Sequence, residues 1–138
     1  METLISRQEK IIKELDSLDT ELKQFDYFFN KAFLFKEGPR SDKYLIEGCI
    51  SKAWVKVWSK ENKIHMEVES DSLILKGLLV AMKEIYEEAS FEEVNNSEFL
   101  LMKSIKVVGL LDEHRMESIS KILKIVIDET QVSNRRIK

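Results

Sequence analysis

The sequence of 138 residues contains one cysteine, one proline and four glycines. A single cysteine, Cys49, cannot form an internal disulfide, so we expect the protein in the reducing environment of the cytoplasm. The glycines stand at positions 38, 48, 77 and 109, and this spacing excludes a Gly-rich phosphate-binding loop. No apolar run reaches the roughly 18 residues of a membrane span, and the opening stretch METLISRQEK does not resemble a signal peptide.

The sequence also lacks an excess of basic residues. It has 22 lysines and arginines against 25 acidic residues, with a net charge of -3, and both signs are mixed along the chain. Nucleic-acid-binding proteins usually concentrate positive charge on one surface, so this composition argues against that class. A content of 43% hydrophobic and 34% charged residues is ordinary for a soluble globular domain.

Side chains that bind soft metals are scarce. Cys49, His65 and His114 are far apart in the sequence and have no paired spacing, so we expect no metal site. A catalytic pair of Cys49 and His114 stays open, because the sequence does not place the two side chains relative to each other. Both histidines are more typical of surface or interface positions than of catalysts.

The first third of the chain has two stretches of helical character. Apolar residues spaced by three or four between Leu4 and Phe25 predict a helix with one buried face. The aromatic stretch FDYFFNKAFLF, residues 25–35, predicts a second and largely buried helix that ends before Pro39.

The middle of the chain has the period of strands. Residues 53–58 and 64–69 alternate apolar side chains with others, and the polar stretch SKENK between them predicts an antiparallel hairpin. His65, Glu67 and Glu69 share the outer face of the second strand, which we expect to be wet.

Helical spacing returns after the hairpin. Residues 71–89 predict a helix that is capped by Ser70 or Asp71 and contains Gly77, a sign of close approach by another backbone. The stretch SFEE, residues 90–93, matches a capping box, and residues 97–108 predict a helix that ends at Gly109. A last helix is expected from about residue 112 to residue 128. Its buried face should comprise Met116, Ile119, Leu123, Val126 and Ile127.

Together these elements predict an α+β fold with a small antiparallel sheet packed against several helices. We expect a single domain over residues 1–138, with a frayed tail at about 129–138.

The stretch from Tyr44 to Trp58 contains the cysteine. Gly48 can adopt backbone angles closed to other residues, which suits a tight turn that presents Cys49. Lys52 is close in sequence, and its positive charge would favour the thiolate. A free cysteine is also often a small buried apolar residue, so the residues alone leave a reactive and an inert thiol open.

Three stretches resemble the SufE family of sulfur-acceptor proteins: IEGCISKAWVKV, ESDSLILKGLL and LLDEHR. The family has a glycine before its acceptor cysteine, a serine two residues after it and an aromatic residue leading the next strand. The matching residues are Gly48, Cys49, Ser51 and Trp54. The family's acidic-Ser-Asp turn and Lys-Gly-Leu helix are matched by Glu69, Ser70, Asp71, Lys76, Gly77 and Leu78. The resemblance covers about residues 25–127 and includes two arginines of the family pattern, Arg40 and Arg115.

The resemblance implies a SufE/IscU-like fold and a role as sulfur acceptor. Cys49 would take persulfide sulfur from a SufS-like cysteine desulfurase and pass it to a scaffold complex for iron–sulfur cluster assembly. The protein would be a persulfide carrier and desulfurase activator and not itself an enzyme; pyridoxal phosphate would stay on the desulfurase, with no cofactor here. The supporting residues would be Gly48, Ser51, Lys52, Asp71 and Arg115.

Each proposed role has a purely structural alternative. Arg115 is the main candidate for a cation beside the thiol, with Lys52 second, and a salt bridge of Arg115 with Asp112 or Glu67 is the alternative. Asp71 is expected to cap the following helix.

Other classes of function stay open. A regulatory module of a desulfurase with an idle cysteine is supported by two departures from the family, Ile50 in place of glutamine and Tyr44 in place of asparagine. An iron–sulfur scaffold normally needs several thiolates, and this chain has one. A redox enzyme with a sensing cysteine is the third alternative.

Overall fold

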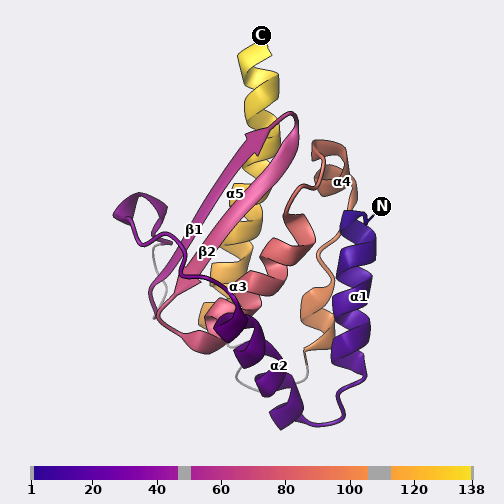
Figure 1. Ribbon diagram of the computed structural model, residues 1–138. Helices are drawn as coiled ribbons and strands as arrows, with labels where there is room; N and C mark the ends of the chain where they lie inside the picture. Colours follow the sequence, from indigo (N-terminus) through magenta and orange to yellow (C-terminus); the bar gives the residue numbers. More distant parts are fainter. Residues whose placement is uncertain (1, 47–50, 106–112, 138) are drawn as a thin grey trace.

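The computed structural model describes residues 2–46, 51–105 and 113–137, with side chains described as far as residue 131. Within these ranges, a two-stranded antiparallel sheet is combined with five α-helices and two 3₁₀ turns (Figure 1). The predicted α+β class is therefore confirmed. None of the helices in the described ranges has the length and apolar character needed to cross a membrane.

The first two helices are α1 (Leu4–Asp16) and α2 (Glu21–Leu34). The expectation of one continuous helix up to Phe25 is wrong, because the Thr20 hydroxyl accepts a hydrogen bond from the Lys23 N–H and starts a new helix. Helix α2 ends before Pro39, as predicted, and Phe35 is already extended. The expectation that this helix is largely buried is wrong, because Phe33 and Leu34 are 69% and 88% exposed.

The predicted hairpin is confirmed as β1 (Ala53–Lys60) paired with β2 (Lys63–Ser70). Its tip holds Glu61 and Asn62 at φ of 54° and 61°, the two left-handed positions that a tight hairpin turn requires. One face buries Ile64, Met66 and Val68 in the core. The outer face is only partly wet, because Glu67 is exposed whereas Glu69 is 1% exposed.

Helix α3 (Leu73–Tyr86) packs between the sheet and α2 and is almost wholly buried. Its N-cap is Ser72, whose hydroxyl accepts from the Leu75 N–H, so the expected caps Ser70 and Asp71 are wrong. The predicted close approach at Gly77 is confirmed, since a Cβ there would overlap the carbonyl of Phe28 in α2.

The capping box predicted at SFEE is confirmed: Ser90 and Glu93 begin α4 (Phe91–Asn96) with reciprocal hydrogen bonds. The helix predicted over residues 97–108 is wrong for residues 97–105, where only the 3₁₀ turn η2 (Leu101–Ser104) forms. Gly109, its expected end, lies outside the described residues.

Helix α5 (Glu113–Ile137) is longer than the predicted helix, which ended near residue 128. Contacts near that point support the extra turns: the Ser59 hydroxyl donates to Glu129, and Thr130 Oγ1 lies 3.2 Å from Asn95 Oδ1. The buried stripe is formed by Ile119, Ile122 and Val126, spaced by three and four. The expected positions Met116 and Ile127 are instead 45% and 47% exposed.

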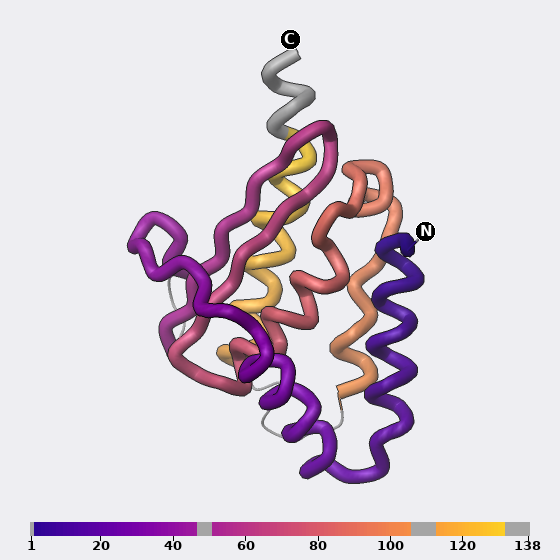
Figure 2. The backbone as a smooth tube through the Cα atoms, viewed as in Figure 1, coloured from indigo at the N-terminus to yellow at the C-terminus, as the bar shows by residue number. Residues whose placement is uncertain are grey.

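The sheet and α3 lie at the centre of the molecule, with α5 running behind the hairpin (Figure 1). The 3₁₀ turn η1 (Asp42–Tyr44) lies beyond β1, on the side of the molecule away from α1 (Figure 2). The chain between η1 and β1 contains the cysteine of the sequence analysis, so the candidate site lies at this flank.

Candidate functional site

Cys49 and Gly48 lie outside the described residues, as does Ile50, but the chain is described on both sides of them. On the near side, the Ile46 N–H donates to the carbonyl of Ala53 at 2.8 Å, and Leu45 forms a bridge with Trp54. The stretch before the cysteine is therefore fixed to the first residues of β1.

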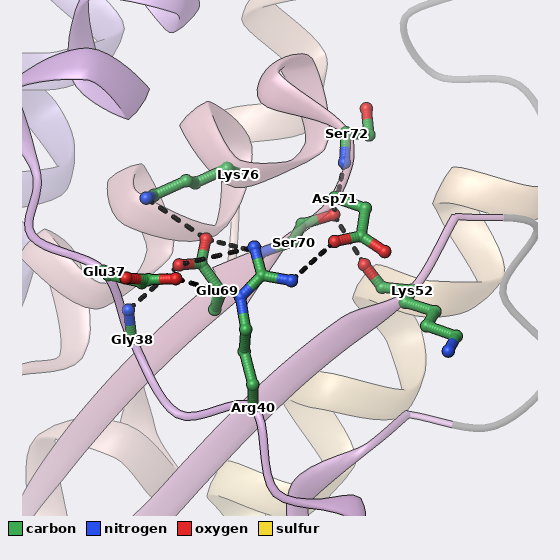
Figure 3. Close-up of polar contacts among 9 residues, drawn as sticks. All are labelled: Glu37, Gly38, Arg40, Lys52, Glu69, Ser70, Asp71, Ser72 and Lys76. Atoms are coloured by element: carbon green, nitrogen blue, oxygen red, sulfur yellow. Dashed lines mark hydrogen bonds and ion pairs between the residues drawn. The ribbon is translucent and has the colours of Figure 1, made fainter.

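On the far side, the fixed point is the carbonyl of Lys52, three residues after the cysteine. The Ser70 hydroxyl donates to it at 2.8 Å, and the Asp71 N–H donates to it at 3.0 Å (Figure 3). Lys52 and Ala53 thus hold consecutive carbonyls that accept from two different segments, the turn before α3 and the chain at Ile46. Lys52 contributes its backbone to this junction, while its side chain is exposed.

Glu69 supports the turn from the buried side. Its carboxylate accepts from the N–H groups of Gly38 and Ser70 at 3.0 and 2.9 Å, and it pairs with Lys76 Nζ at 3.1 Å (Figure 3). Burial alone would raise the pKa of Glu69, but these three donors outweigh burial and lower it. The expectation of a wet Glu69 is wrong for this reason: a carboxylate with several donors can be buried in its charged form.

Arg40 joins the same cluster from the chain after α2. Its Nη1 lies 2.7 Å from the Asp71 carboxylate and its Nη2 4.0 Å from Glu69, and the guanidinium stands 4.9 Å from the ring of Trp54. The hydrogen bond with Asp71 raises the pKa of Arg40. Asp71 therefore serves as the partner of Arg40 and not as the helix cap that was expected.

The structure brings together only part of the predicted site. Ser51 is half buried beside the junction, and Asp71 and the backbone of Lys52 belong to it. Arg115 lies in the first turn of α5 and is half buried, but the described residues define no distance from Cys49 to Arg115. The alternative partner Asp112 also lies outside the described residues.

The described parts of the chain give no support to a catalytic role of either histidine. Within them, no group of three or more histidine, cysteine, aspartate or glutamate side chains could hold a metal ion. His65 stacks on Trp58 and lies 3.4 Å from Glu87, while His114 is exposed at the start of α5.

The backbone N–H groups of Ile46 and Gly38 were missed as contributors to the site. Both act through the backbone, and a backbone N–H leaves no mark in a sequence. The glycine at position 38 is a weak signal of close backbone packing, and the structure explains it: a Cβ there would overlap the carbonyl of Val68.

Comparisons with known proteins identify the family of this chain. The family model SufE, described as an Fe-S metabolism associated domain, matches residues 9–130. The chain belongs to the SufE family. This membership confirms the resemblance seen in the sequence, supports a role in sulfur transfer and implies interaction with a cysteine desulfurase.

This SufE chain is similar to a curated relative and to a solved structure. It is 25% identical over 120 residues to the cysteine desulfuration protein SufE of Wigglesworthia glossinidia brevipalpis, covering 83% of each chain. Its fold is similar to the solution structure of a hypothetical protein from Thermus thermophilus, with a TM-score of 0.73, 13% identity, and coverage of 94% of this chain and 96% of that one. The second likeness shows the fold alone.

Proposed function

We propose that this SufE protein accepts sulfur on Cys49 from a SufS-like, pyridoxal-phosphate-dependent cysteine desulfurase. It then passes the sulfur to a scaffold complex for iron–sulfur cluster assembly, acting in the cytoplasm as a carrier and activator rather than as an enzyme. One observation carries the proposal: the only thiol of this SufE-family chain lies, in the sequence, between two fixed points. They are the hydrogen bond from Ile46 to Ala53 and the carbonyl of Lys52, which accepts two hydrogen bonds.

The transfer step balances without an outside oxidant or reductant. The Cys49 thiolate attacks the terminal sulfur of the desulfurase persulfide, and a bond forms between Cys49 Sγ and that sulfur. The sulfur–sulfur bond of the donor breaks, and its electron pair leaves with the desulfurase cysteine as a thiolate. The transferred sulfur keeps its hydrogen, so the product is a persulfide on Cys49.

The reaction needs a thiolate, and a free thiol with a pKa of about 8.5 supplies little of it near neutral pH. A nearby cation favours the thiolate, and each pKa unit of lowering is worth about 1.4 kcal/mol. Arg115 is the proposed cation, with Lys52 as the second candidate. Gly48 and Ser51 are proposed to shape the turn that presents the thiol.

Sulfide release from free cysteine by the cognate desulfurase tests this function. The unaltered protein should stimulate release, and Cys49→Ser should abolish the stimulation, because serine cannot take up the sulfur. Ser120→Ala, an exposed hydroxyl removed from α5, should stimulate like the unaltered protein. Full stimulation by Cys49→Ser would instead support the regulatory module.

A further inference from the structure

The Ser70 hydroxyl donates its single proton to the carbonyl of Lys52. Its oxygen accepts from the Ser72 N–H at 3.1 Å, and its own O–H donates to the carbonyl of Lys52 at 2.8 Å. A backbone N–H can only donate, so the remaining hydroxyl proton points at the Lys52 oxygen. Ser70 is 4% exposed, and water therefore does not compete freely for this bond.

The Lys52 carbonyl receives a second donor from the same turn, the Asp71 N–H at 3.0 Å. Two donors on one carbonyl oxygen fix the orientation of the peptide between Lys52 and Ala53. The next carbonyl, that of Ala53, is fixed by the Ile46 N–H. These two peptides lie at the start of β1, where the described chain resumes after the stretch that contains Cys49.

The turn at residues 70–72 is held by the buried side chain of Glu69. Glu69 accepts from the Ser70 N–H at 2.9 Å and pairs with Lys76 of α3, both side chains being nearly buried. Ser70 also lies opposite Ala53 in the register of the hairpin, so strand pairing places it beside the peptide that it binds. Among the described residues, Ser70 is the one side chain that donates to Lys52.

We propose that Ser70 is a positioning residue for sulfur uptake: its hydroxyl fixes the Lys52 peptide and thereby the approach of Cys49 to the donor sulfur. This inference rests on the proposed function. Holding reacting groups in the right geometry lowers the barrier of a transfer without changing how the partners dock. Loss of the hydroxyl should therefore slow transfer at saturating desulfurase and leave the half-saturating concentration unchanged.

Single-turnover transfer from a persulfide-loaded desulfurase tests the proposal with Ser70→Ala, Ser70→Thr and Ser72→Ala. Ser72→Ala is the matched control, because it also removes a hydroxyl at the start of α3, but one that caps the helix at the Leu75 N–H. We expect Ser70→Ala to slow transfer about tenfold, Ser70→Thr to restore most of the rate, and Ser72→Ala to transfer normally despite its lower melting temperature. Equal rates for Ser70→Ala and Ser72→Ala, or no rescue by threonine, would overturn the proposal.

Amide hydrogen exchange keeps this test separate from that of the function. Ser70→Ala should speed exchange at Ile46, Asp71 and Ser72, whereas Ser72→Ala should speed it at Leu75 and leave Ile46 unchanged. If the unaltered protein takes up no sulfur while this exchange pattern is seen, the proposed function fails, and only the fixing of the Lys52 peptide by Ser70 stands. An unchanged exchange pattern in Ser70→Ala overturns the positioning role whatever the function.

Discussion

At the scale of single residues, the site depends on a buried carboxylate that the sequence pattern placed in solvent. Strand periodicity puts Glu69 on the outer face with His65 and Glu67, and that assignment to a face holds. Burial of Glu69 follows from the chain at Gly38 and the side chain of Lys76, which cover this end of the face. Periodicity cannot reveal this, because the covering groups come from elsewhere in the sequence.

The same carboxylate predicts how stability changes in acid. The folded pKa of Glu69 is below its ordinary value, so its contribution to the free energy of unfolding is present above that value and is lost as pH falls through the folded pKa. We expect the free energy of unfolding, measured by urea titration, to fall between about pH 5 and pH 3. Glu69→Gln should show a shallower fall.

Glu67→Gln is the matched control, since Glu67 lies on the same strand but is exposed. It should reproduce the pH dependence of the unaltered protein. A fall in Glu69→Gln as steep as that in Glu67→Gln would contradict the role of the Glu69 hydrogen bonds.

At the scale of elements, local chemistry decided which predictions succeeded. The hairpin and the Ser90–Glu93 capping box were predicted correctly because period-two alternation and capping hydrogen bonds act within a few residues. The break at Thr20 was missed because apolar spacing continues across it. The length of α5 was missed because its support comes from Ser59 and Asn95, far away in sequence.

Gly77 allows α3 to pack closely against α2, because it has no side chain. Alanine favours a helix over glycine by about 1 kcal/mol, yet a Cβ at residue 77 would overlap the carbonyl of Phe28 and push α2 away from α3. We expect Gly77→Ala to lower the free energy of unfolding by about 1–3 kcal/mol, as overpacked cores do.

Chemical denaturation measures this change against Glu84→Ala, a control on the exposed side of the same helix. The control removes a partly exposed ion pair with Lys31 and should cost less than about 1 kcal/mol. A Gly77→Ala protein as stable as the unaltered one would show that α2 and α3 do not approach each other as described.

At the scale of the whole molecule, the site is assembled from three segments distant in sequence: the chain after α2, the start of β1 and the turn before α3. The sequence predicted the α+β class and, through its resemblance to SufE proteins, singled out Arg40 and Asp71 in two of these segments. It could not predict that Arg40 pairs with Asp71, because the two are 31 residues apart and meet only in the folded protein. The proposed roles of Cys49 and Arg115 stay predictions.

The mass of the intact protein after incubation with its desulfurase and free cysteine tests the central claim most directly. We predict an addition equal to one sulfur atom, located by peptide mapping on Cys49, removed by a thiol reductant and absent from Cys49→Ser. An unchanged mass with an active desulfurase present, or an addition that persists in Cys49→Ser, would contradict the assignment of Cys49 as the sulfur acceptor.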